Sequence, residues 1–500
     1  MRRSTTGGGA APAARATLSR PQIVAALTLL VVGVAGAATW GWQQAGDNAA
    51  RTRLTAPPVS APAVIVAHLS GMYETAQRQP RSIAAVGPLC LAYHADMFFG
   101  PAERCYDLAI DLAPADWRWG YYRALIDADR GGSPALVARL RAVAEANPAF
   151  GPAWLRIGDA EFKAGNYQGA AAAWQRAQAL AEPTPVPGEP PHRIEIPLAA
   201  HAGLGLARVA LVRGDAAGAV RVLEPVLGQS AEFGAAWRLI GEAYRAAGKE
   251  LDAARAIARA GRLPAFAPYA DPMVDALARE SRNSTLLLRM ASEATLSVNA
   301  EWSQYLTRRA LEFDPSNPEA VLKMGRVLRT FNREADALPY FRKYHELVPG
   351  DYQVLAQIGT SLSALGRFDE AAGYFKEALK GVDDAITHYN LGLLMSRTGR
   401  LDAAAVSYQR ALDRDPYLSD ARSNLATVFA RQGRLDRAVD ALTRLLADEP
   451  ENPLALTNLG LIRFQQGRLV EARRELEAAL QIAPGMTQAA EALEAIGAAR

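Results

Sequence analysis

The sequence predicts an all-α protein, a superhelical solenoid of about eleven stacked helical hairpins. Between 318 and 486 it repeats in blocks of thirty-four residues, one of them a residue short. Each block holds two runs with apolar residues at the i, i+3, i+4 and i+7 spacing of a helix. A glycine or asparagine separates the two runs, and a proline ends most blocks. Units of this length bury their apolar faces against one another, so tandem copies predict a solenoid.

Positions are numbered within each block, the regular blocks beginning at 318, 352, 385, 419 and 453. A small residue at position 8 lets the second helix approach the first, and an alanine at position 20 is its small counterpart. A bulky residue at position 24 fills the space between the helices, and glycine at position 15 allows the positive φ of a turn. The block at 385 carries these features as Gly392, Gly399, Ala404 and Tyr408.

At these residues the chain resembles the tetratricopeptide repeat (TPR) family, and its overall order resembles membrane-anchored periplasmic TPR proteins of bacteria. The resemblance implies a concave groove that binds proteins or peptides. It covers divergent repeats at 83–267, which contain a proline-rich insertion at 183–199. A second insertion at 268–283 follows. Near-consensus repeats at 284–486 and a terminal cap helix at 487–500 complete the chain.

The N-terminal region predicts a membrane anchor. Residues 1–21 are rich in arginine and small residues and predict a disordered cytoplasmic tail. Residues 22–42 form an apolar stretch long enough to span a bilayer, with arginines before it that favour a periplasmic location for the repeats. Residues 43–82 predict a stalk and a leading helix. The alternative is a signal peptide cleaved near Ala37, which would leave a soluble periplasmic protein.

The two cysteines of the chain, Cys90 and Cys105, stand at positions 8 and 23 of the first block. The two helices of a hairpin run antiparallel, so these positions face each other. A disulfide is therefore feasible in an oxidising compartment. Two buried free thiols are the alternative, because cysteine is a common small core residue.

The sequence contains no catalytic, phosphate-binding or metal-binding motif that would indicate an enzyme, a cofactor or a metal site. Its net charge of +3 gives no indication of nucleic-acid binding. The resemblance to periplasmic TPR proteins then implies a non-catalytic scaffold in the bacterial inner membrane, for envelope complex assembly, cytochrome maturation or secretion. The alternatives are a non-catalytic subunit or regulator of a membrane enzyme complex and a polysaccharide-binding export scaffold.

A row of asparagines is the candidate ligand site. Asn390, Asn424 and Asn458 all stand at position 6, on the face of the first helix that is expected to line the groove. An amide side chain can pair with both polar groups of a peptide backbone, so such a row could follow an extended ligand. The other interpretation is that each asparagine only bonds the neighbouring repeat. Stacking and charge around the row are expected from Tyr389, Arg397, Arg431 and Phe464.

Overall fold

The computed structural model describes residues 20–131, 134–180, 196–264, 267–296 and 299–498; in the first helix, side chains are described from Val32, with 33, 36 and 37 excepted. These residues form 26 α-helices and no strand. The prediction of an all-α solenoid is therefore confirmed. Most of the predicted tail and most of the proline-rich insertion lie outside the described residues.

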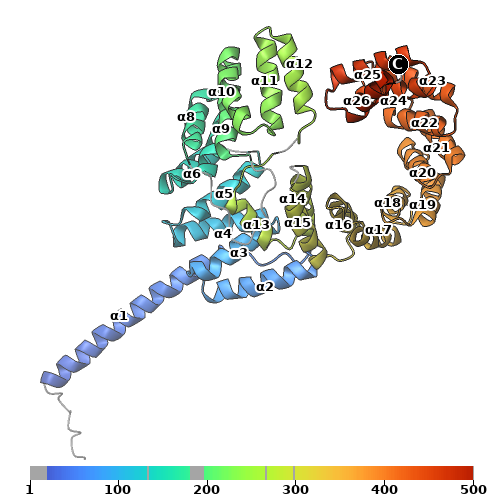
Figure 1. Cartoon of the computed structure of the whole chain (residues 1–500). Coiled ribbons are helices and arrows are strands. Elements are labelled where there is room, and N and C mark those ends of the chain that lie inside the picture. Colours follow the sequence, from blue (N-terminus) through green and yellow to red (C-terminus); the bar gives the residue numbers. More distant parts are fainter. Residues whose placement is uncertain (1–19, 132–133, 181–195, 265–266, 297–298, 499–500) are drawn as a thin grey trace, which may run out of the picture.

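Eleven hairpins, each formed by two antiparallel helices, are present in the described ranges, and successive hairpins pack against each other within two groups, hairpins 1–5 and hairpins 6–11. Hairpins 1–5 curve into one arc and hairpins 6–11 into a second (Figure 1). The hairpins of the first arc are α3 (Ile83–Ala95) with α4 (Phe99–Leu112), α5 (Trp117–Asp129) with α6 (Pro134–Ala146), α7 (Gly151–Lys163) with α8 (Tyr167–Gln178), α9 (Leu198–Val212) with α10 (Ala216–Gln229), and α11 (Gly234–Ala246) with α12 (Glu250–Ala260).

The second arc contains the near-consensus blocks and ends in the predicted cap helix, α26 (Thr487–Ala498). Its hairpins are α14 (Ser284–Leu296) with α15 (Ala300–Phe313), α16 (Pro318–Thr330) with α17 (Glu334–Leu347), α18 (Gln353–Ala364) with α19 (Phe368–Gly381), α20 (Ala385–Arg397) with α21 (Leu401–Arg414), α22 (Ser419–Arg431) with α23 (Leu435–Asp448), and α24 (Pro453–Gln465) with α25 (Leu469–Ile482).

Hairpin 9 shows why the repeat positions have their residues. A Cβ atom added to Gly392 would lie 2.7 Å from ring atoms of Tyr408, so the glycine at position 8 makes room for the bulky residue at position 24. Ala404 at position 20 is fully buried. The turn glycine Gly399 has φ +74°, and in hairpin 7 Asn332 adopts φ +56° at the same position. Asparagine tolerates this left-handed conformation better than most residues do.

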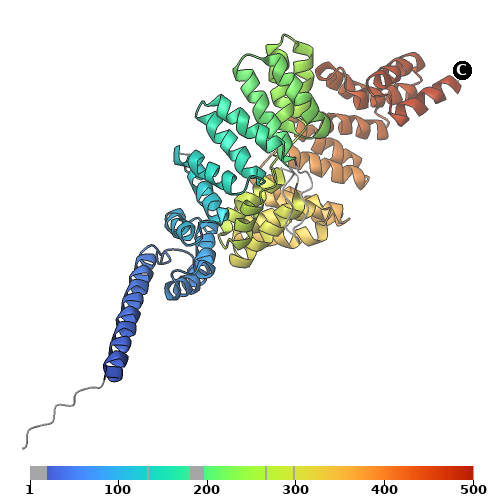
Figure 2. The same cartoon turned by 90° about the vertical axis from the view of Figure 1, so that its left-hand side faces the viewer.

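The N-terminal helix α1 (Arg20–Arg51) projects away from the repeats (Figures 1 and 2). Its end is fixed to hairpin 1, because Ala50 and Leu54 are buried in the core formed with that hairpin. Arg51 Nε donates to the carbonyl of Gln77 at 3.0 Å, at the end of the leading helix α2 (Ala63–Arg78). The structure thus differs from the predicted stalk, since a continuous helix leads directly into the folded core.

The apolar stretch predicted as an anchor lies within α1, where Trp40 and Trp42 are 65% and 86% exposed. Among the side chains that are described, no helix is long and apolar enough to cross a membrane. Much of 22–42 lies outside those side chains, so the anchor stays a prediction.

The segment between the two arcs turns back into the first arc. Helix α13 (Pro272–Glu280) lies on the inner side of hairpins 1–5 and packs against α3 (Figure 1). Leu277 of α13 belongs to the same buried cluster as Tyr93 of α3. The second predicted insertion is therefore a structured part of the N-terminal core, and we call residues 267–283 the crossing segment.

Candidate functional site

The first helix of each hairpin lies toward the inner side of its arc and the second helix toward the outer side (Figure 1). Side chains that project from the first helices therefore form the concave surface. In the first arc this surface is occupied by the crossing segment. In the second arc it carries the predicted asparagine row.

The crossing segment is held in the first arc by a polar cluster around Asp271. Asp271 Oδ2 accepts hydrogen bonds from Tyr121 Oη at 2.6 Å and from Arg156 Nη2 at 3.0 Å. Arg156 Nε also donates to Tyr121 Oη at 2.8 Å. Burial raises the pKa of Tyr121, which keeps its phenol protonated as a donor to the carboxylate. One carboxylate thus joins the segment to the first helices of hairpins 2 and 3.

Further contacts extend along the segment in both directions. The ring of Tyr269 lies 5.4 Å from that of His201 on α9. The backbone N–H of Arg282 donates to Asp96 Oδ1 at 2.7 Å, and His68 Nε2 lies 3.2 Å from Glu280 Oε1. The segment consequently contacts residues of the leading helix and of hairpins 1 to 4.

The residues that hold the segment stand on the first helices of hairpins 2, 3 and 4, at three different repeat positions. Tyr121 is at position 5 of the block beginning at 117, Arg156 at position 6 of the block beginning at 151, and His201 at position 2 of the block beginning at 200. The sequence analysis did not identify these residues as contacts. Only Arg156 could have been found from the sequence, because it stands at position 6 like the asparagines of the row.

In the second arc each bonded asparagine reaches the preceding hairpin. Asn424 Nδ2 donates to Tyr389 Oη at 3.2 Å, and Asn458 Nδ2 donates to Ser423 Oγ at 3.3 Å. Each bond uses one of the two amide hydrogens, and within the described chain neither side-chain carbonyl oxygen has a hydrogen-bond partner. Asn390 makes no side-chain hydrogen bond to any described residue. All three side chains are partly exposed.

Three other residues expected near the row also contact protein. Arg397 lies with its guanidinium carbon 5.4 Å from the ring centre of Phe368, on the second helix of the preceding hairpin. Arg431 Nη1 donates to the carbonyl and the hydroxyl of Ser396 at 3.2 and 3.1 Å. Phe464 packs against the core of the last hairpin and the cap helix. Arg397 and Arg431 thus join neighbouring hairpins.

Position 6 continues the row toward the start of the second arc. It is occupied by Gln357 in hairpin 8 and by Lys323 in hairpin 7. Gln357 Oε1 accepts a hydrogen bond of 3.4 Å from Arg329 Nη1, which again joins adjacent hairpins. The row therefore comprises five polar side chains, and it ends in a cation.

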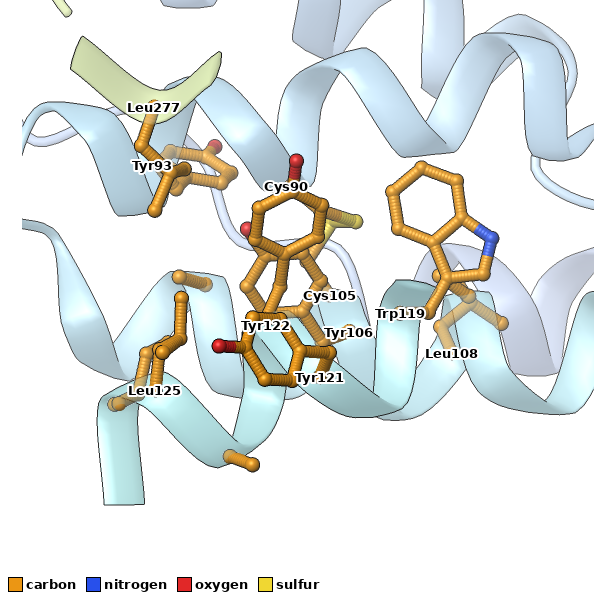
Figure 3. Close-up of a cluster of buried hydrophobic side chains, with 14 of the residues drawn as sticks. Cys90, Tyr93, Cys105, Tyr106, Leu108, Trp119, Tyr121, Tyr122, Leu125 and Leu277 are labelled. Carbon is orange, nitrogen blue, oxygen red and sulfur yellow. A yellow bond between two sulfur atoms is a disulfide. The ribbon is translucent and has the colours of Figure 1, made fainter. Parts of the chain in front are cut away.

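The cysteines lie far from this groove, in hairpin 1. Cys90 and Cys105 are joined as a disulfide with their Cα atoms 5.2 Å apart. Figure 3 shows the bond within an aromatic cluster that includes Tyr93, Tyr106 and Tyr122. The bond ties the two helices of the hairpin against which α13 packs.

The structure contains no group of three or more His, Cys, Asp or Glu side chains placed to hold a metal ion, as far as its residues are described.

Two arcs of stacked hairpins with concave inner surfaces define a superhelical helical-repeat protein. A family model of the tetratricopeptide repeat matches residues 137–185, 204–270, 357–419 and 423–487. The chain belongs to the tetratricopeptide repeat family. Hairpins 1, 6 and 7 fall outside the matched residues, although the structure forms them.

Several solved structures are similar to parts of the chain. YrrB, described as a TPR protein with an unusual peptide-binding site, is 22% identical over 38% of this chain and 97% of its own, with a TM-score of 0.33. PilW, described as a type IV pilus biogenesis factor, is 20% identical over 42% of this chain and 98% of its own, with a TM-score of 0.39. Yeast Tom70 is 15% identical over 83% of this chain and 95% of its own, with a TM-score of 0.35. No curated protein matches the sequence.

Proposed function

We propose that this TPR protein is a non-catalytic scaffold whose second arc binds a segment of a partner protein along the position-6 row. The concave surface of hairpins 7–11 offers the groove, and the amides of Asn390, Asn424 and Asn458 offer donors and acceptors to a peptide backbone. The scaffold would assemble a protein complex of the bacterial envelope.

The observation that carries this proposal is the occupied groove of the first arc. There the chain holds its own crossing segment through positions 2, 5 and 6 of successive first helices, with Arg156 at position 6. The same positions of the second arc have no chain segment bound to them among the described residues. A groove that holds a segment in one half of the molecule is a reasonable precedent for the same use in the other half.

The proposed location is the periplasmic face of the inner membrane, with residues 22–42 as the anchor. The uncharged apolar sequence of that stretch supports a membrane span. The disulfide in hairpin 1 supports an oxidising compartment. Protease added to intact spheroplasts should digest the repeats and leave a short membrane-embedded fragment. A soluble mature protein beginning near Ala38 would instead identify a cleaved signal peptide.

The groove is tested by replacing Asn424 and Asn458 with alanine. Native co-purification first identifies the partner, and its affinity for each variant is then measured by calorimetry. Each lost neutral hydrogen bond should weaken binding by about 0.5–1.5 kcal/mol. The matched control is Gln409→Ala with Gln481→Ala, which removes two exposed amides from second helices.

Unchanged affinity in the asparagine variant would refute the groove assignment. A thermal unfolding curve that matches the wild type is needed for a loss of affinity to count, because both asparagines also bond the preceding hairpin. A partner that binds only the control surface would place the interaction on the outer helices.

A further inference from the structure

A hollow of about 330 Å³ lies at the start of the second arc, where α16 faces the end of α14 and the start of α15. Ala300, Leu322 and Val327 give it an apolar wall. Lys323 and Arg326 stand on the same helix at the edge of this wall, at positions 6 and 9. The hollow therefore adjoins the cationic end of the position-6 row.

The two cations at the hollow form no salt bridge with a described residue. Glu319, one helical turn before Lys323, also lines the hollow, but its carboxylate is not within ion-pair distance of either cation. Burial lowers the pKa of Lys323, while the nearby carboxylate of Glu319 opposes this shift and the charge of Arg326 adds to it. In hairpin 6 the equivalent cation Arg289 is paired with Glu293 at 3.2 Å.

In the first arc, a cation at position 6 already binds an acidic group. Arg156 at position 6 pairs with Asp271, whose other oxygen accepts from the backbone N–H groups of Met273 and Val274 at the start of α13. The apolar residues that follow Asp271 in the crossing segment, Met273, Val274 and Leu277, contact the hydrophobic core of the first arc. The bound element is thus an acidic residue followed by apolar anchors.

We infer that the hollow beside Lys323 and Arg326 is the anchor site of the second groove and takes an acidic residue followed by a bulky apolar side chain of a partner protein. The carboxylate pairs with the two cations, and the apolar side chain enters the space against Leu322 and Val327. The rest of the ligand then follows the amide row toward hairpin 11. This inference rests on the proposed function, because it specifies the ligand class of the same groove.

The test is selection of short random peptides displayed on phage against the purified full chain in detergent. Wild-type protein should enrich peptides in which Asp or Glu precedes Leu, Ile, Met or Phe. Lys323→Glu with Arg326→Glu should remove that enrichment and weaken binding of a synthetic selected peptide by about tenfold or more in fluorescence anisotropy. The matched control is Lys376→Glu with Arg410→Glu, the same charge change on exposed residues of second helices.

The outcomes separate this inference from the proposed function. Selected peptides without an acidic residue, or an acidic preference that survives the reversal at Lys323 and Arg326, would overturn the anchor site. In either case the proposed groove would still be supported if replacing Asn424 and Asn458 abolished binding of the selected peptides. If the wild type enriches no peptide, or the two cations retain only an anionic polysaccharide such as polygalacturonate, both proposals fail. Circular dichroism of every variant must match the wild type before a loss of binding is counted.

Discussion

Replacing Gly392 by alanine should destabilise hairpin 9, although alanine is the better helix former. The added Cβ would lie 2.7 Å from two ring atoms of Tyr408, a separation that real Cβ contacts essentially never show. Tyr408 is itself 1% exposed and in contact with Tyr389, so its ring has little room to move. The methyl group must therefore push the two helices of the hairpin apart.

The magnitude follows from two opposing terms. Glycine in a helix interior costs roughly 0.5–1 kcal/mol relative to alanine, so the substitution gains that much. Overpacking a filled core costs about 1–3 kcal/mol. Gly373 of hairpin 8 is the matched control, because a Cβ added there meets nothing within 4 Å. Gly373→Ala should stabilise the chain, and the two variants should differ by about 1–3 kcal/mol.

Hairpin 10 suggests the compensating change. It has Ala426 at position 8 and Leu442 at position 24, and both are fully buried. Gly392→Ala combined with Tyr408→Leu reproduces this pair in hairpin 9. We expect the double variant to be more stable than the sum of the single changes predicts, by about 0.5–3 kcal/mol of coupling.

Hydrogen exchange measured by mass spectrometry is the appropriate assay, because a solenoid opens locally and each hairpin contacts only its neighbours. Gly392→Ala should raise exchange in α20 and α21 and, less strongly, in hairpins 8 and 10. We expect Gly373→Ala to slow hydrogen exchange in α19. If Gly392→Ala slowed exchange in α20 and α21 to the same extent, the packing of position 8 against position 24 would be refuted.

The other predictions concern hairpin 1 and the crossing segment. Reducing the Cys90–Cys105 bond, which closes a loop of 15 residues, should lower stability by about 3 kcal/mol in urea unfolding, and mass spectrometry that finds two free thiols in untreated protein would contradict the bond. Burial raises the pKa of Asp96 from 3.8 to about 6, so the folded protein favours the protonated carboxyl. Its contribution to the free energy of unfolding is therefore lost as pH rises between those two values, and Asp96→Asn should remove that loss. Burial lowers the pKa of His94 from 6.5 to about 3, so the folded protein favours the neutral imidazole. Its contribution to stability is therefore lost as pH falls between those two values, and thermal melts at several pH values should show a smaller loss of stability in acid for His94→Gln. Asp271→Ala leaves Arg156 and Tyr121 without their shared carboxylate and should cost about 3–5 kcal/mol, with raised hydrogen exchange in α13, whereas unchanged exchange there would show that the polar cluster does not hold the segment.

The repeat period was sufficient to predict the hairpins and their internal packing. Gly392, Gly399, Ala404 and Tyr408 have the roles that their spacing indicates, because contacts within a hairpin are local in sequence and recur in every block. The same logic identified the position-6 row. It could not show that Asn424 and Asn458 would each bond the preceding hairpin, since that depends on the angle between neighbouring hairpins.

The path of the crossing segment could not be predicted in this way. Asp271 meets Tyr121 across 150 residues, and Glu280 meets His68 across 212 residues, with no periodic pattern that relates them. The packing of the residues before the leading helix could not be predicted for a similar reason. Pro57, Pro58 and Pro62 correctly indicated an irregular stretch, but the burial of Leu54 depends on an apolar surface that only the folded hairpin 1 provides.

The occupied groove also gives a physical reason for the divergence of the first repeats. A repeat that always holds the same internal segment can match it closely, so its inner positions carry individual residues such as Tyr121, Arg156 and His201. Under the proposed function, the second arc accepts a partner reversibly, and side chains that pair with any peptide backbone, such as the three successive asparagines, suit that role. On this proposal the two halves of the chain use one repeat geometry in two ways, the first to build a fixed core and the second to keep an accessible groove.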